Sequence, residues 1–349
     1  MEIGIYTFGD VGTHPVTKEV TTAHQRLKNL IEEIELADQL GLDVFAVGEH
    51  HRSDYAVSAP TIILGAAAVK TKQIRLSSAV TVLSSDDPIR VFQQFATIDL
   101  LSAGRAEIMA GRGSFIESFP LFGYDLNDYD ELFSEKLEML LKLNEDEHIS
   151  WNGKHTPTID KRGVYPRPYQ DKLPIWIAVG GTPESIIRAA THGLPLALAI
   201  IGGMPSAFVP HIKLYRDVYN KTGHDMDQLQ LSINSHTYIA DDSQTAADEF
   251  YPPYAEVMTR IGKERGWPPT NRQQYDATLS PKGALLVGSP QEVIDKILYE
   301  HELFGHTRFL AQMSLGAMPH RKILHAIELL GTKVAPAIKK YTRQKKVAS

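Results

Sequence analysis

The chain has no cysteine among its 349 residues, so disulfide bonds and thiolate chemistry are both excluded. It also lacks an apolar run approaching the roughly 18–20 residues that a membrane span requires. Its first residues, Met1 to Tyr6, do not combine a basic region with an apolar signal core. We therefore expect a protein of a reducing compartment, with the cytoplasm as the default location and no membrane partner.

Positive charge is scarce as well. The formal net charge is −6 at pH 7, so the chain offers no bulk basic field for nucleic acid or an anionic membrane. The exception is a cluster of lysine and arginine residues near the C-terminus, at about 338–349, which we interpret as a solvated basic tail.

Short apolar runs alternate with amphipathic segments along the whole chain. Three of the helical segments begin with a capping residue followed by proline, at Asp87-Pro88, Thr182-Pro183 and Ser289-Pro290. The expected strands cover residues 3–8, 44–47, 74–83, 106–110, 175–179, 196–200, 229–240 and 307–313. The expected helices begin near residues 22, 60, 87, 129, 182, 206, 290 and 319.

This alternation predicts an α/β fold, a single-domain (β/α)8 TIM barrel over residues 1–349. Strands buried on both faces give continuous apolar runs rather than alternating ones. Irregular stretches at about 149–173 and 241–283 are expected to be insertions, the second made of short helices and a loop. The alternative is an open doubly wound sheet, but Gly4 and Gly9 do not form the dinucleotide fingerprint that such a sheet carries after its first strand.

Two of the expected strands end in residues that can do chemistry. The run 44–47 leads into Gly48-Glu49-His50-His51, and the run 106–110 leads into Gly111-Arg112-Gly113-Ser114. The carboxyl ends of barrel strands are where active sites are built. An imidazole and a glycine-flanked guanidinium at two such ends indicate a phosphorylated cofactor with a proton-transfer group beside it.

These motifs resemble those of the bacterial luciferase-like flavin-dependent monooxygenases. The resemblance covers nearly the whole chain and is densest between residues 47 and 123. It rests on motifs in the family's order and spacing: Glu49-His50-His51, Pro88-Ile89-Arg90, 99–105, Gly111-Arg112-Gly113 and the late 288–293. The resemblance implies a barrel that binds FMN at the carboxyl ends of its strands. It further implies that reduced FMN and dioxygen oxidise a small organic substrate.

His50 stands where luciferases carry a catalytic histidine, so the resemblance assigns it proton transfer near the flavin ring. We expect His51 to be its structural partner. Glu49, His50 and His51 could instead bind a metal, but adjacent strand residues point to opposite faces. Because no other histidine cluster supplies the missing ligands, we expect no metal site.

The resemblance places Arg112 on the flavin phosphate, with Gly111, Gly113 and Ser114 around it. The turn Gly180-Gly181-Thr182, ahead of a capped helix, faces the same phosphate in the family. The family often has hydroxyl-bearing or acidic residues where this chain has the two glycines, so backbone N–H groups would have to replace them. A tight turn would use the same glycines equally well.

Ala79, Val80 and Thr81 of the third strand are expected beneath the flavin ring. The family carries a non-proline cis peptide here, aligned near Ala79-Val80. Further candidates for lining the pocket are Tyr6, Phe8, Phe115, Tyr238 and Met313.

Three functions remain open at this point. The leading one is an FMN-dependent monooxygenase whose flavin is reduced either by a separate NAD(P)H-flavin reductase or by NAD(P)H that binds only transiently. A deazaflavin (F420)-dependent oxidoreductase that transfers hydride would use the same fold. A non-enzymatic flavin-binding protein is the third, although storage needs no proton-transfer group such as His50. We expect a homodimer, and the sequence does not identify the substrate.

Overall fold

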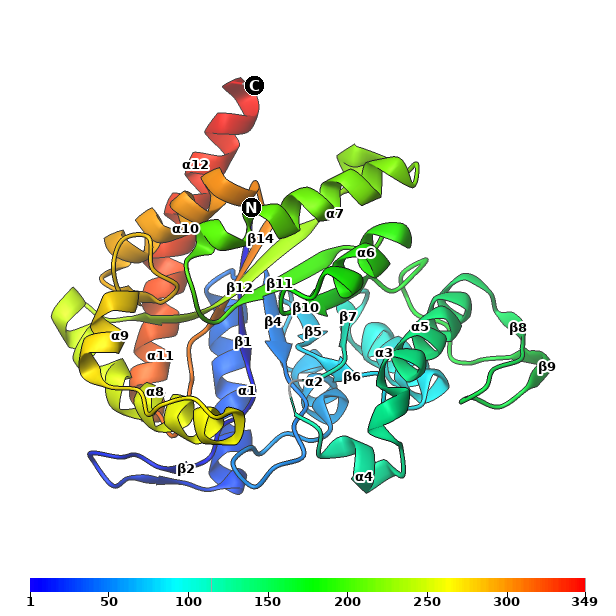
Figure 1. The fold of residues 1–349 in the computed structure, drawn as a ribbon, viewed down its shortest axis with the longest axis horizontal. Coiled ribbons are helices and arrows are strands. Elements are labelled where there is room, and N and C mark those ends of the chain that lie inside the picture. Colours follow the sequence, from blue (N-terminus) through cyan, green and yellow to red (C-terminus); the bar gives the residue numbers. More distant parts are fainter. Residues whose placement is uncertain (114, 349) are drawn as a thin grey trace.

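The computed structural model describes residues 1–113 and 115–348, and it confirms the closed parallel barrel. Each strand pairs in parallel with the next along the chain, and the last pairs with the first (Figure 1). Within the described residues the eight barrel strands are β1 (Glu2–Thr7), β4 (Val44–Val47), β5 (Arg75–Ser78), β7 (Ala106–Gly111), β10 (Ile175–Val179), β11 (Leu196–Ile200), β12 (Leu231–Ile239) and β14 (Arg308–Gln312).

Helices follow the strands and surround the barrel (Figure 1). They are α1 (Ala23–Gln39), α2 (Pro60–Ala68), α3 (Pro88–Ser102), α4 (Ser118–Phe122), α5 (Tyr129–Glu145), α6 (Pro183–Thr191), α7 (Val209–Lys221), α8 (Ser243–Arg265), α9 (Arg272–Thr278), α10 (Pro290–Phe304), α11 (His320–Leu329) and α12 (Ala335–Ala348). The expected caps are present: Asp87 accepts from the N–H groups of Ile89 and Arg90, and Ser289 forms a capping box with Glu292.

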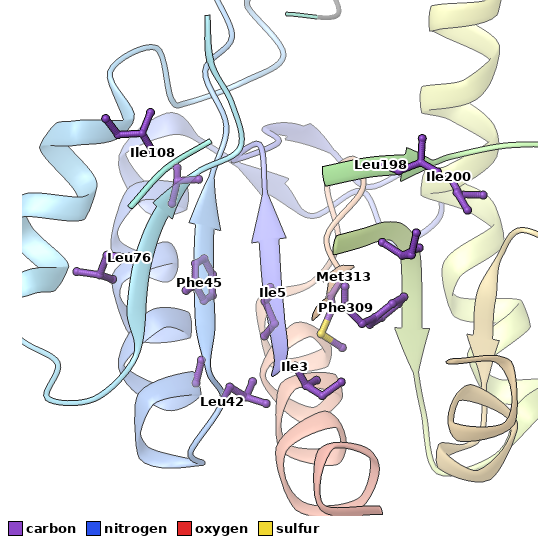
Figure 2. Close-up of a cluster of buried hydrophobic side chains, with 14 of the residues drawn as sticks. Ile3, Ile5, Leu42, Phe45, Leu76, Ile108, Leu198, Ile200, Phe309 and Met313 are labelled. Atoms are coloured by element: carbon purple, nitrogen blue, oxygen red, sulfur yellow. The ribbon is translucent and has the colours of Figure 1, made fainter. Parts of the chain in front are cut away.

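The strands bury both faces, in two separate layers. In β1, Ile3 and Ile5 belong to the large cluster between strands and helices, part of which Figure 2 shows. Tyr6 belongs to a smaller cluster that also holds Val44 and Met109. This alternation explains why the strand sequences are apolar throughout.

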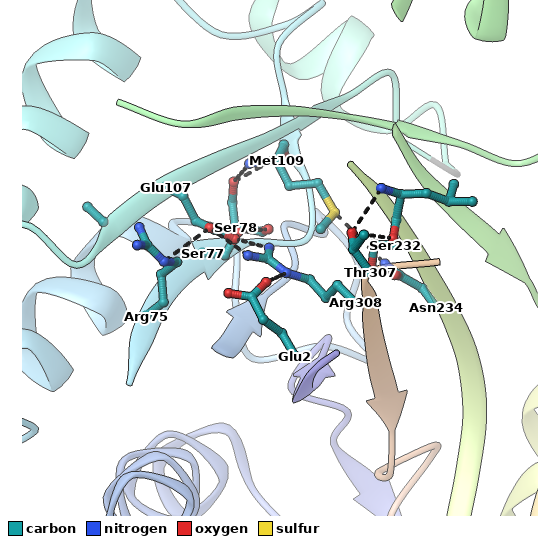
Figure 3. Close-up of polar contacts among 12 residues, drawn as sticks. Glu2, Arg75, Ser77, Ser78, Glu107, Met109, Ser232, Asn234, Thr307 and Arg308 are labelled. Atoms are coloured by element: carbon teal, nitrogen blue, oxygen red, sulfur yellow. Dashed lines mark hydrogen bonds and ion pairs between the residues drawn. The ribbon is translucent and has the colours of Figure 1, made fainter. Parts of the chain in front are cut away.

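The amino-terminal end of the barrel is closed by charged side chains (Figure 3). Arg308 donates to Glu107 at 2.5 Å and to Glu2 at 2.7 Å, and its guanidinium lies 4.1 Å from the centre of the Trp176 ring. Arg308 and Glu107 are both almost completely buried, so each charge depends on the other for compensation.

Several expected elements differ in the structure. The single strand expected over 74–83 is broken into β5 and β6 (Thr81–Val82) by a cis peptide bond between Ala79 and Val80. The insertion at 149–173 contains most of an antiparallel hairpin, β8 (His148–Trp151) with β9 (Ile159–Gly163). Shorter elements that the sequence did not indicate are β2 (Gly12–Thr13), β3 (Val20–Thr21), β13 (Leu286–Gly288), 3-10 turns at 126–128, 205–208 and 226–228, and a π-helical turn at 330–334.

The expectation of short helices and a loop over 241–283 was wrong for its first half. Helix α8 is 23 residues long and continues through Pro252 and Pro253. Proline lacks the N–H that a helix interior needs. Here the burial of Phe250, Tyr254 and Val257 against the barrel outweighs that loss.

The basic C-terminal segment is helical up to Ala348 rather than a free tail from 338 onward. Ile338 is fully buried, and the Lys339 ammonium donates to Asp43 at 2.9 Å. The amino group of Met1 donates to Thr342 at 3.2 Å, so the N-terminus lies against α12 (Figure 1).

Candidate active site

A cavity of about 640 Å³ opens at the carboxyl ends of the barrel strands. Its size is typical of a site for a cofactor and a small substrate. Of the predicted site residues it is lined by His50, Ala79, Val80, Gly111, Arg112, Gly113, Gly180 and Thr182. One cavity therefore collects predicted residues from the ends of four strands.

His50 forms part of the cavity wall just beyond β4. Its ring packs edge-on against Phe8, with ring centres 4.4 Å apart, and lies tilted against Tyr55, with ring centres 4.3 Å apart. Gly48 makes this packing feasible, because a Cβ there would lie 2.4 Å from the Phe8 ring. The Nε2 atom of His50 is buried and has no hydrogen-bond partner among the described residues.

Burial lowers the pKa of His50 to about 4. The charged form of a histidine is disfavoured where water is excluded, so this imidazole is neutral near pH 7. A neutral imidazole can accept or donate a proton, and its unpartnered nitrogen is free to meet a ligand in the cavity.

His51 does not line the cavity with His50 and points toward Glu49 instead. Its Nε2 lies 2.8 Å from one carboxylate oxygen of Glu49. The other oxygen accepts from the backbone N–H of Val82 at 2.9 Å. Glu49 and His51 thus fasten the loop after β4 to β6, and that loop carries His50.

The third strand contributes Ala79 and Val80, joined by the cis peptide bond that the family resemblance implied. Gly111 lies against them, because a Cβ at that position would approach the Val80 methyl groups to 2.9 Å. Thr81 is not part of the cavity lining. Its buried hydroxyl donates to Ser78 at 3.0 Å.

Arg112 extends from the end of β7 into a cluster of charged side chains. It forms an ion pair with Asp130, and its guanidinium lies 4.6 Å from the centre of the Tyr129 ring. Arg188 of α6 approaches the same carboxylate at 4.0 Å, and its buried Nη1 has no partner among the described residues. Ser114 lies outside the described residues.

The turn Gly180–Thr182 follows β10, the neighbour of β7 in the barrel, with Ile177 paired with Ala110. Gly181 has a φ of +109°, which a residue with a side chain rarely adopts. Thr182 precedes α6, and its hydroxyl does not cap the helix. The amino-terminal end of α6 and two guanidinium groups therefore lie at adjacent strand ends, an arrangement suited to an anion.

The opposite wall of the cavity was not predicted. It includes Asn234 and His236 of β12 and Gln312 of β14. Asn234 and His236 are two residues apart and so share a face of the strand, which is a sequence signal that could have found them. Gln312 follows an apolar run without any motif. Among the expected lining residues, Tyr6, Phe8 and Phe115 are present. Tyr238 belongs to the core instead, as does Met313 (Figure 2).

Helix α8 and the residues after it form one side of the cavity. Met258, Ile261 and Trp267 line it from this side. A group of ion pairs, which we call the Arg52 cluster, holds the end of α8 to the barrel loops. It comprises Arg52 with Asp54, Glu117 and Glu264, and Arg260 with Asp54.

Comparison with known proteins identifies the family. The family model described as luciferase-like monooxygenase matches residues 1–307. This chain belongs to the luciferase-like monooxygenase family.

Members of the family resemble the chain over almost all of its length. It is 25% identical to 4-hydroxyprotoasukamycin monooxygenase of Streptomyces nodosus subsp. asukaensis, over 88% of this chain and 86% of that one. It is 23% identical to the alkanal monooxygenase alpha chain of Photobacterium leiognathi, over 91% and 95%. The structure of monooxygenase RslO1 from Streptomyces bottropensis superposes with a TM-score of 0.83 at 24% identity, covering 97% and 99% of the two chains.

No helix within residues 1–113 and 115–348 is long and apolar enough to cross a membrane.

Proposed function

We propose that this protein is a flavin-dependent monooxygenase that uses reduced FMN and dioxygen to oxidise a small organic substrate. The observation that carries the proposal is the division of one cavity into two ends. Arg112 and the start of α6 offer positive charge and free N–H groups at adjacent strand ends. His50 offers a neutral, unpartnered imidazole elsewhere in the same wall.

The residues present fit the phosphate and the ring of FMN. Arg112, Arg188 and the backbone of Gly180–Thr182 would hold the phosphate. Ala79 and Val80 would support the ring, and Phe8, Tyr55 and Phe115 would exclude water around His50. Bound and reduced, FMN would supply the electrons for oxygen activation. His50 would hold or move a proton beside the ring.

Relatives agree with a flavin or a deazaflavin cofactor. A Pseudomonas putida monooxygenase, described as a complex with FMN, superposes with a TM-score of 0.75 at 20% identity over 97% of this chain. An F420-dependent secondary alcohol dehydrogenase superposes equally well, at 18% identity. F420 with hydride transfer is therefore the second candidate. We favour FMN because all the named oxidoreductases among the curated relatives cited above are monooxygenases.

The test is to titrate the protein with FMN, F420 and riboflavin and to follow flavin fluorescence. FMN should bind, and Arg112→Ala should weaken it by roughly 10- to 150-fold, since a hydrogen bond to a charged group contributes about 1.5–3 kcal/mol. Riboflavin lacks the phosphate, so its affinity should not change in that variant. Arg272→Ala, outside the cavity, is the control.

Failure to bind FMN, with F420 bound instead, would replace this proposal by the deazaflavin alternative. An unchanged FMN affinity in Arg112→Ala would remove Arg112 from the phosphate site. A separate reductase that supplies reduced FMN and a homodimeric assembly both remain predictions.

A further inference from the structure

Three polar side-chain atoms on one wall of the cavity lack partners. His236 and Gln312 are only 4% and 1% exposed. Neither the Nδ1 atom of His236 nor the amide oxygen and nitrogen of Gln312 has a hydrogen-bond partner among the described residues. Leaving such a group unpaired inside a protein costs about 1–3 kcal/mol, so a concentration of them is unusual in a packed interior.

The barrel register places these groups together. His236 and Gln312 are direct cross-strand partners in the β12–β14 pair, and both line the cavity. Gln312 is also paired with Tyr6 on β1, its other neighbour. Paired residues of parallel strands point to the same face, so the two side chains form one continuous polar patch. We call it the His236–Gln312 patch.

The patch faces the side of the barrel that we assign to the cofactor. In the strand order β1-β4-β5-β7-β10-β11-β12-β14, the strands β14 and β7 are four positions apart, as are β12 and β5. Strands four apart in a closed eight-stranded barrel face each other across its axis. The patch therefore lies across the cavity from Val80 and Arg112, where a second molecule would meet the ring.

The chemistry of the patch is that of an uncharged ligand. The Gln312 amide offers a donor and an acceptor, and His236 offers a further nitrogen. Burial lowers the pKa of His236 to about 4, so its ring is neutral near pH 7. No carboxylate belongs to the cavity lining within the described residues, and the arginines in that lining, Arg112 and Arg265, come from other elements.

The remaining surface above the patch is largely apolar. Met258 and Ile261 of α8, Trp267 beyond it and Leu315 after β14 line the same cavity. A ligand anchored at the patch would therefore extend an apolar body beneath α8.

We propose that the His236–Gln312 patch binds the substrate, through an uncharged carbonyl, carboxamide or hydroxyl group attached to an apolar body. This assignment rests on the proposed function, because only an enzyme of that kind would make the bound molecule a substrate. The binding site itself does not require that function.

Octanamide and octanoate are a matched pair of probes, because they share a chain and differ mainly in the charge of the head group. We would measure their binding to the protein by calorimetry, with and without saturating FMN. Octanamide should bind at least tenfold more tightly than octanoate. Gln312→Met, which keeps the shape but not the hydrogen bonds, and His236→Phe should each weaken octanamide by about tenfold.

Both variants should leave the FMN affinity unchanged. His306→Phe is the control, because His306 is also buried with unpartnered nitrogens but lies outside the cavity. Octanamide affinity should be the same in this control as in the wild type. If His236→Phe does not fold, Gln312→Met alone decides the result.

Equal affinity for the two probes would overturn the inference. An octanamide affinity that is unchanged in Gln312→Met would overturn it as well. A loss of FMN affinity in Gln312→Met would assign the patch to the cofactor instead. If the protein fails to bind FMN but binds octanamide in a Gln312-dependent way, the proposed function fails and the binding site stands.

Discussion

At the scale of single residues, His50 has the clearest expected role. It is buried, neutral and unpartnered at Nε2 in the wall of the cavity. His50→Ala should leave FMN affinity nearly unchanged and reduce productive oxygenation by roughly 10²–10⁴-fold, the usual effect of losing a general acid–base. The measurement is product formed, and peroxide released, per reduced FMN oxidised with an identified substrate.

The exposed His325 on α11 provides a matched control, and His325→Ala should change neither quantity. The pH profile gives a second check. Because burial holds the pKa of His50 near 4, below its ordinary 6.5, the imidazole gains a proton only below about pH 4. In the wild type, protonation of His50 should therefore cause no fall of kcat/KM near pH 6.5. The shape of the profile around that pH should be the same in His50→Ala. If His50→Ala forms as much product per reduced FMN oxidised as the wild type, and as fast, the role of His50 is structural.

Residue types predicted the part of the site that carries a motif and missed the part that does not. Arg112 and His50 follow short apolar strands, Arg112 between two glycines and His50 two residues after Gly48, and both line the cavity. Gln312 has no such context, so only the barrel register reveals it. Thr81, expected beneath the flavin ring, is not among the residues that line the cavity, and its hydroxyl donates to Ser78.

At the scale of elements, we expect helix α8, which lines the cavity, to act as a cover that responds to ligands. We expect trypsin to cut the ligand-free protein first after Lys263 or Arg265, both exposed at the end of α8. FMN should slow this cleavage, since a filled cavity supports Met258 and Ile261 from below. Mass spectrometry of the first fragments locates the cut.

Arg52 fixes that end of α8 through Glu264, with an N···O distance of 2.6 Å, and contacts Phe115 of the cavity wall. Arg52→Met should therefore accelerate cleavage at the same site. Arg272→Met breaks ion pairs inside the insertion only, with Asp248 and Asp276, and should not accelerate it. First cuts elsewhere, at a rate that FMN does not alter, would refute the role of a cover.

The sequence predicted elements well where a single periodicity or a cap defines them, as in α3 and α10. It failed where tertiary packing overrides local preference. Pro252 and Pro253 suggested a break in a helix that packing carries through. The strand β13 is three residues long and forms by pairing with β12, so no local pattern marks it.

At the scale of the whole molecule, the stability of the barrel depends on pH through ionisable groups that are buried without partners. Glu300 on α10 is the clearest example. It is 1% exposed, and neither of its carboxylate oxygens has a hydrogen-bond partner among the described residues. Burial raises its pKa to about 8, against the attraction of nearby Lys296. The folded protein therefore holds a proton on Glu300 near pH 7 that the unfolded chain releases.

This difference makes stability depend on pH with a defined sign. Between the unfolded pKa of 4.5 and the folded pKa of about 8, the folded state binds the extra proton, so the free energy of unfolding falls as pH rises. Glu300→Gln removes that term. Relative to wild type, the variant should gain roughly 3–4 kcal/mol in unfolding free energy between pH 5 and pH 8.5, at about 1.36 kcal/mol per pKa unit.

Urea denaturation of both proteins at the two pH values measures the gain. The matched control is Glu302→Gln, an exposed glutamate on the same helix, whose difference from wild type should not vary with pH. Buried groups that do not interact with Glu300 titrate identically in wild type and variant, so they cancel in the comparison. Lys296 does not cancel, because burial lowers its pKa to about 8 and the charge of Glu300 raises it. The difference in unfolding free energy between variant and wild type could instead stay constant from pH 5 to pH 8.5. Glu300 would then already be ionised in the folded protein, paired with Lys296, and its burial would not make stability fall as the pH rises.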